Sequence, residues 1–105
     1  MRSSGAAVTI LLTAAPFSNA CAVDDAEVLA LIQKHCVMCH AGKPTHESFQ
    51  EAPKNIALET IADVKKHAAT ITAQTVQTKA MPLANQTGMT DEERATLGQW
   101  LKNQQ

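Results

Sequence analysis

The chain has 105 residues, which is enough for one domain, and its formal net charge is −1. No basic run with interleaved aromatic residues occurs in the sequence, which excludes nucleic acid as an expected partner. Large rings are scarce, since the sequence holds no Tyr and only Phe17, Phe49 and Trp100. A domain this small usually needs disulfides, a metal or a cofactor to complete its core. The composition therefore predicts that a bound group supplies part of the core.

Residues 1–22 have the pattern of a secretory signal, with Arg2 near the start, an apolar run and then small residues. Cleavage before Cys21 and cleavage before Val23 both fit this pattern. The apolar run is too short for a membrane span of about 20 residues, and Cys21 lacks the leucine expected upstream of a lipoprotein cysteine. We therefore expect a signal peptide at 1–22, a domain at 23–105 and a periplasmic location. Membrane association is expected only through a partner or, less favoured, a lipid anchor.

A first helix is predicted from Asp25 to about Cys39. Asp24 and Glu27 stand at the spacing of a capping box. The apolar residues that follow recur with the i, i+3, i+4 spacing of one helix face, at Val28, Leu31 and Ile32.

This helix leads into Cys36-Val37-Met38-Cys39-His40, which has the spacing of a covalent haem attachment site. Cys36 and Cys39 can add to the two vinyl groups of one porphyrin, and His40 then supplies an axial ligand to the iron. A thiol redox pair is typical of a βαβ context, and a zinc site needs a second ligand pair. Neither pattern accompanies the motif. We therefore predict one covalently bound haem c.

A loop is predicted from His40 to Asn55, and a second helix from Ile61 to Gln77, capped by Thr60 and Asp63. Its buried face is expected at Ile61, Val64, Ala68, Ile71 and Thr75.

Met81 is the expected second axial ligand of the iron. The second helix must end before Met81-Pro82, because proline disfavours a helical conformation in the residue before it. A loop therefore delivers Met81. Met89 is the less favoured methionine, and His46 is the best alternative among the remaining histidines. His35 and His67 are expected to be ordinary polar residues.

The clearest helix start is Thr90, with Glu93 reaching back in a capping box and further carboxylates at the positive end of the helix dipole. Gly98 in the helix interior indicates a close crossing, for which the first helix is the expected partner. No segment alternates with period two, so no strands are expected. The buried stripe is expected at Leu97, Trp100 and Leu101.

Cys36, Cys39, His40 and Met81-Pro82, flanked by a first and a last helix, resemble the single-haem class I cytochromes c. The resemblance implies an all-α fold in which three to four helices surround one covalently bound haem, with histidine–methionine iron. It also implies that a backbone carbonyl at Pro53, or less favourably at Pro44, accepts the hydrogen bond from His40.

Longer stretches are similar to the cytochrome c domain that ends the membrane-bound bacterial urate hydroxylases. There the domain is thought to accept electrons from urate oxidation in the membrane domain. This sequence has no multi-span membrane region, so urate chemistry is not assigned to it. The similar stretches are His40–His46, Ala52–Asn55, Lys79–Leu83 and Thr87–Thr90.

The expected function is that of a periplasmic one-electron carrier, an electron-transfer protein rather than an enzyme, whose iron cycles between ferric and ferrous states. It would dock weakly and transiently with a redox protein donor and acceptor. Lys34, Lys43 and Lys79 either ring the haem edge to orient such a partner or are scattered solvated residues. Two alternatives remain open. One is a detached redox module of a urate-oxidising membrane enzyme, and the other is a haem centre with an open site for ligand sensing or peroxide chemistry.

Overall fold

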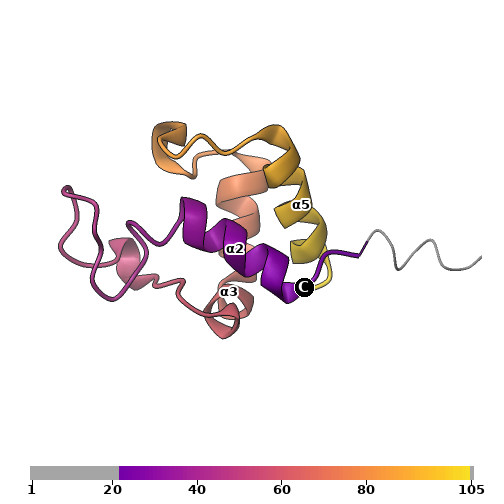
Figure 1. Cartoon of the computed structure of the whole chain (residues 1–105), viewed down its shortest axis with the longest axis horizontal. Helices are drawn as coiled ribbons and strands as arrows, with labels where there is room; N and C mark the ends of the chain where they lie inside the picture. Colours follow the sequence, from indigo (N-terminus) through magenta and orange to yellow (C-terminus); the bar gives the residue numbers. More distant parts are fainter. Residues whose placement is uncertain (1–21, 105) are drawn as a thin grey trace, which may run out of the picture.

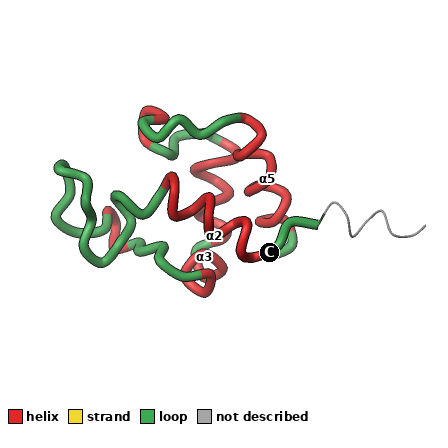
Figure 2. Tube along the Cα trace, in the orientation of Figure 1, coloured by secondary structure: helices red, strands yellow, loops and turns green. Residues whose placement is uncertain are grey.

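The computed structural model describes residues 22–104, and this part of the chain is built from helices and loops without a strand (Figure 2). The expected all-α class is confirmed for these residues. The predicted signal segment, apart from Ala22, and Cys21 lie outside the described residues. The elements are α2 (Asp25–His35), the 3₁₀ turn η1 (Pro53–Asn55), α3 (Ile61–Lys66), α4 (Ala68–Ile71), the π-helical η2 (Thr72–Gln77), the 3₁₀ turn η3 (Leu83–Asn85) and α5 (Asp91–Lys102).

Helix α2 begins as predicted, because the Asp24 side chain accepts a hydrogen bond of 2.8 Å from the Glu27 N–H. It ends at His35, four residues earlier than expected. The N–H groups of both Cys36 and Val37 donate to the Ile32 carbonyl, at 2.8 and 3.2 Å, and this shared acceptor interrupts the regular i to i−4 ladder. The Cys36–His40 motif therefore lies on a separate turn beyond the helix.

The second predicted helix begins and ends where expected, but it is not a single continuous helix. The capping box of Thr60 and Asp63 is confirmed, and helical structure extends to Gln77. At His67, however, the backbone leaves the α-helical region, with φ −105° and ψ 19°, so α3 and α4 are separate helices. Of the expected buried face, Val64, Ala68, Ile71 and Thr75 are buried and Ile61 is half-buried.

Threonine hydroxyls accompany the widening of this region into a π-helix. Thr72 and Thr75 donate from Oγ1 to the carbonyls of Ala68 and Ile71, at 2.8 and 2.6 Å. Bonds of this kind compete with the main-chain donors for the same carbonyl oxygens and bend helices. Hydrophobic spacing does not register this competition, which is why it predicted a single regular helix.

Helix α5 follows its prediction closely. The Thr90 and Glu93 capping box is formed in both directions, each bond 3.0 Å long, and the expected stripe is buried. The close crossing at Gly98 was assigned to the wrong partner. A Cβ at this position would lie 3.3 Å from Cγ2 of Val76, so the helix approaches η2 rather than α2 at this point.

The hydrophobic core lies where α2, α3, α4 and α5 meet (Figure 1). Helix α5 is also joined to α2 by a 2.9 Å hydrogen bond from Trp100 Nε1 to Asp25 Oδ1. The segment between α2 and α3 projects away from this core, and the segment between η2 and α5 lies along another side (Figure 1). These two segments, whose only helical parts are the short turns η1 and η3, carry most of the predicted site residues. Within residues 22–104, no helix combines the length and apolar character that crossing a bilayer requires.

Candidate cofactor-binding site

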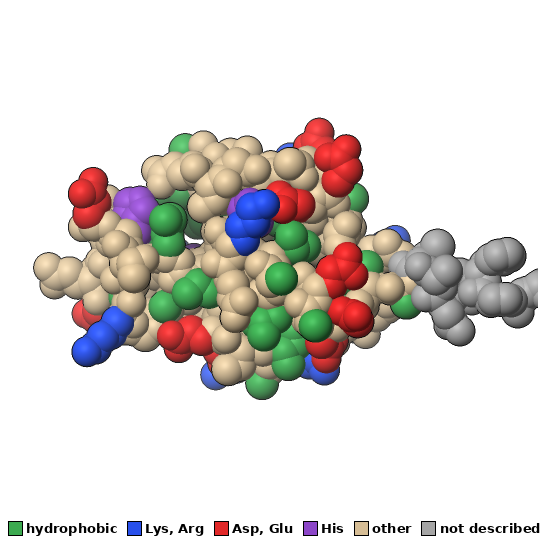
Figure 3. Space-filling view, in the orientation of Figure 1, with side chains coloured by type: hydrophobic (Ala, Val, Ile, Leu, Met, Phe, Trp, Pro, Cys, Tyr) green, Lys and Arg blue, Asp and Glu red, His purple; other side chains and the backbone are tan. Residues whose placement is uncertain are grey.

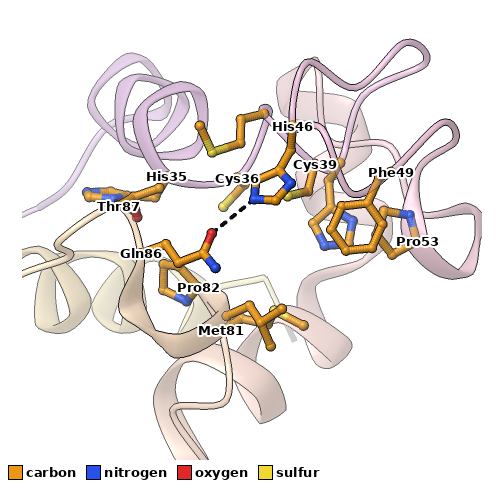
Figure 4. A pocket seen from close by; sticks show the side chains of 13 residues that line it. His35, Cys36, Cys39, His46, Phe49, Pro53, Met81, Pro82, Gln86 and Thr87 are labelled. Carbon is orange, nitrogen blue, oxygen red and sulfur yellow. Dashed lines mark hydrogen bonds between the residues drawn. The ribbon is translucent and has the colours of Figure 1, made fainter.

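Two adjoining cavities, of about 240 and 180 Å³, share Cys36, His40, Pro53 and Met81 in their walls. Both are mainly apolar. Figure 3 shows histidine and hydrophobic side chains around a hollow on this side of the molecule, and Figure 4 shows the larger cavity from close by. The structure thus brings the residues that the sequence singled out to one apolar space. Cys39 also lines the larger cavity, together with Phe49 and Pro82.

The two cysteines are free thiols that lie just after the C-terminal end of α2. Burial raises the pKa of Cys36 to about 12, with the neighbouring Cys39 thiol as the second cause, and burial also raises the pKa of Cys39. A thiol redox pair requires a lowered pKa, which proteins commonly obtain at a helix N-terminus. Cys36 and Cys39 have the opposite environment. This environment argues against a reactive thiol–disulfide exchange pair.

The imidazole of His40 lines both cavities. Its Nδ1 lies 2.7 Å from the carbonyl oxygen of Ile56, so Nδ1–H is the donor and Nε2 is left available for a metal. The expected acceptor at Pro53 or Pro44 is therefore wrong. The Pro53 carbonyl instead accepts the Ile56 N–H at 3.1 Å, which closes the η1 turn.

Met81 lines both cavities from a loop, in the position that the sequence predicted. Its N–H donates to the carbonyl of Gln74 at 2.8 Å. Met89 lines neither cavity and is 5% exposed within the hydrophobic core cluster. The geometry favours Met81 over Met89 as a ligand, because only Met81 faces the same space as His40.

His46 has other partners, and His67 lines neither cavity. His46 lines the larger cavity, but Nδ1 accepts from the Ser48 N–H at 3.0 Å and Nε2 lies 3.0 Å from Gln86 Oε1 (Figure 4). His67 lies at the break between α3 and α4.

His35, the last residue of α2, is buried against the segment that leads into α5. Its two ring nitrogens lie 2.7 Å from Thr87 Oγ1 and 3.0 Å from Glu93 Oε1. Lys34 also pairs with Glu93, at 2.9 Å. Both α2 side chains thus hold the start of α5, and Lys34 is engaged in an ion pair. Lys43 and Lys79 are exposed.

Sequence reasoning missed Arg94, a buried cation whose Nη1 donates to the carbonyls of Thr75 and Met81, at 2.6 and 2.8 Å. A signal was present in the sequence. Arg94 stands three and seven residues before Leu97 and Leu101, so it belongs to the buried stripe of α5. A charged residue in such a stripe indicates a specific polar partner.

The donor set limits which groups the cavities could hold. Within residues 22–104, no three His, Cys, Asp or Glu side chains lie close enough together to hold a metal ion. One imidazole and one thioether beside an apolar space fit iron that is already held by a porphyrin, and the paired thiols fit its vinyl groups. Comparison with protein-family models, curated proteins and solved structures finds no match to this chain.

Proposed function

We propose that this chain is an exported, periplasmic one-electron carrier with a single c-type haem. In this proposal, Cys36 and Cys39 hold the haem through thioether bonds, and His40 and Met81 are the axial ligands. The finer fold assignment, a class I cytochrome c in which the helices surround the haem, belongs to the same proposal.

One observation carries the proposal. Both thiols, the imidazole of His40 and the thioether of Met81 border one apolar space, although Met81 is about forty residues from the motif. Met81 reaches this space because its N–H is bound to Gln74 and its carbonyl to Arg94. A chance Cys-x-x-Cys-His sequence has no reason to meet a methionine across an apolar cavity.

Each residue has a definite task in this function. The Ile56 carbonyl fixes the ring orientation of His40 and increases its basicity as a ligand. The thioether of Met81 is a soft, neutral donor that favours the ferrous state. When bound, the haem iron supplies the redox chemistry by cycling between ferric and ferrous states. With the haem bound, His40 and Met81 would both be held at the iron, and the apolar lining would limit the access of water and small molecules.

Electron transfer also requires contact with partners. Met38 and Leu83 line the larger cavity and are 40% and 51% exposed, so apolar surface borders the opening of the site. A small exposed apolar area suits weak, transient docking to a redox donor and acceptor, because such encounters use small interfaces.

The test is made on the protein purified from an exporting host. We expect its mass to exceed that of the processed chain by one haem, and the haem to resist acid–acetone extraction. Replacing both Cys36 and Cys39 with Ser should make the haem extractable. Met38→Ala, between the two cysteines, is the matched control and should keep the covalent bonds. Haem that extracts freely from the unaltered protein would overturn the attachment proposal.

A second measurement separates a carrier from a haem centre with an open site. The reduced protein should bind carbon monoxide only slowly at neutral pH, since Met81 must first leave the iron. Rapid binding of carbon monoxide to the unaltered protein would instead support ligand sensing or peroxide chemistry.

A further inference from the structure

Arg94 lies near the start of α5 with 9% of its surface exposed. Its guanidinium carries a permanent charge, and burying a charge is unfavourable unless hydrogen bonds compensate it. Among residues 22–104, no carboxylate forms an ion pair with Arg94. The compensation comes instead from two main-chain carbonyls, of Thr75 at 2.6 Å and of Met81 at 2.8 Å, both bound to Nη1.

The two carbonyls belong to different segments of the chain. Thr75 lies in η2, whereas Met81 lies in the loop between η2 and α5. The Met81 N–H donates to Gln74 in η2 at 2.8 Å, so both main-chain polar groups of Met81 are held. Lys79 and Ala80, which precede it, are exposed. These two bonds therefore hold Met81 between the exposed residues Lys79 and Ala80 and the buried Pro82.

We propose that Arg94 is a positioning residue for Met81, which it holds at the cavity by joining the Met81 carbonyl to η2 and α5. This inference rests on the proposed function, in which Met81 binds the haem iron. A loop that carries a ligand dissociates it whenever the loop opens, and exposed loops open at low free-energy cost. Arg94 adds a charge-assisted hydrogen bond to the closed loop, and such bonds are stronger than neutral ones.

Arginine suits this position better than lysine. The two N–H groups of Nη1 lie in a fixed plane and reach both carbonyls at once, whereas lysine presents a point charge on a flexible stem. Arg94→Met removes the donors and keeps an apolar stem. Arg94→Lys keeps the charge and part of the hydrogen bonding. Lys102→Met removes one positive charge from the exposed end of the same helix and serves as the control.

The first arm of the test measures amide hydrogen exchange in the haem-loaded protein. Arg94→Met should accelerate exchange of the Met81 amide at least tenfold, while the amide of Leu97, in the core of α5, remains protected. Arg94→Lys should lie between this variant and the parent, and Lys102→Met should match the parent. Unchanged exchange at Met81 in folded Arg94→Met would overturn the proposal. If Arg94→Met does not fold, the same comparison is made with Arg94→Lys.

The second arm measures the consequence at the iron. Arg94→Met should weaken the methionine-dependent ferric absorption at the red end of the spectrum and bind carbon monoxide at least tenfold faster when reduced. In a Met81→Ala background, Arg94→Met should change carbon monoxide binding no further. An equal effect in both backgrounds would overturn the proposal, since Arg94 would then act on general packing. Absence of the methionine band from the parent would count against the proposed function, whereas the exchange arm would still decide whether Arg94 holds Met81.

Discussion

Nδ1 of His40 lies 2.7 Å from the carbonyl oxygen of Ile56, sixteen residues further along the chain. The carbonyl is aimed at the ring by the η1 turn, in which Lys54 and Asn55 adopt positive φ values of 57° and 60°. Consecutive left-handed residues reverse the chain sharply, and Asn tolerates this conformation better than most residues. The orientation of His40 therefore depends on a short strained turn, not on a helix.

Asn55→Val tests this dependence, because a β-branched side chain is strongly disfavoured at positive φ. The turn should rearrange and weaken the bond from His40 to Ile56. A less basic imidazole stabilises ferric iron less, so we expect the reduction potential to rise. Lys43→Val is the control, since Lys43 is exposed in the same projecting segment and has no positive φ. Equal potentials in the parent and Asn55→Val would contradict this role for the turn.

Substitution of Met81 and substitution of Met89 should have different effects. Met81→Ala should abolish the methionine-dependent ferric absorption and open the reduced iron to carbon monoxide, because Met81 faces the cavities. Met89→Ala should keep both properties and lower the free energy of unfolding by about 3 kcal/mol, since Met89 is buried in the core. Spectra and denaturant unfolding check the two effects. Loss of the band in Met89→Ala alone would move the ligand assignment to Met89.

The sequence predicted helix starts better than helix ends. Asp24, Thr60 and Thr90 each cap a helix as expected, because capping depends on one side chain and the N–H groups two or three residues further on. The end of α2 and the π-helical form of η2 depend instead on competition for carbonyl acceptors. That competition involves the folded backbone and leaves little trace in residue spacing.

In the candidate site too, some residues could be predicted from the sequence and others could not. Cys36, Cys39 and His40 form a local motif, and Met81-Pro82 is a recognisable pair, so the sequence alone singled them out. Ile56 contributes only a carbonyl group, which every residue has, so residue type cannot reveal it. Its identity follows from the shape of the η1 turn.

Glu93 should make the free energy of unfolding depend on pH in the acidic range. The Thr90 backbone N–H, and then the ion pair with Lys34 and the bond with His35, lower the pKa of Glu93 from 4.5 to about 2. A carboxyl group whose pKa is lower in the folded state stabilises the protein above its unfolded pKa and loses that contribution as pH falls. The contribution of Glu93 should therefore disappear between about pH 4.5 and pH 2.

Glu93→Gln measures this contribution, because glutamine can keep the capping geometry without the charge. The difference in unfolding free energy between parent and variant should shrink as the pH falls from about 4.5 towards 2. Glu92→Gln is the control, since Glu92 is exposed in the same helical turn. Denaturant unfolding over a series of pH values gives both curves. A parent–variant difference that does not vary with pH would rule out the charge of Glu93 as the source.

Gly98 and Val76 should show strong coupling in stability. Alanine is favoured over glycine in a helix interior by about 1 kcal/mol, and Ala95→Gly, exposed in the same helix, measures that value locally. At Gly98 the added Cβ would meet Cγ2 and Cγ1 of Val76 at 3.3 and 3.5 Å. We therefore expect Gly98→Ala to give no gain in unfolding free energy, because the crowding offsets the helix preference.

In a Val76→Ala background the crowding is gone, so Gly98→Ala should then stabilise the protein by about 1 kcal/mol. Equal effects of Gly98→Ala in both backgrounds would contradict the close crossing.

Gly98 lies one turn beyond Arg94, and Val76 follows Thr75, whose carbonyl Arg94 binds. Pushing η2 away from α5 should thus also lengthen the bridge from Arg94 to Met81. Gly98→Ala in the parent background should weaken the methionine-dependent ferric absorption, and Val76→Ala should restore it.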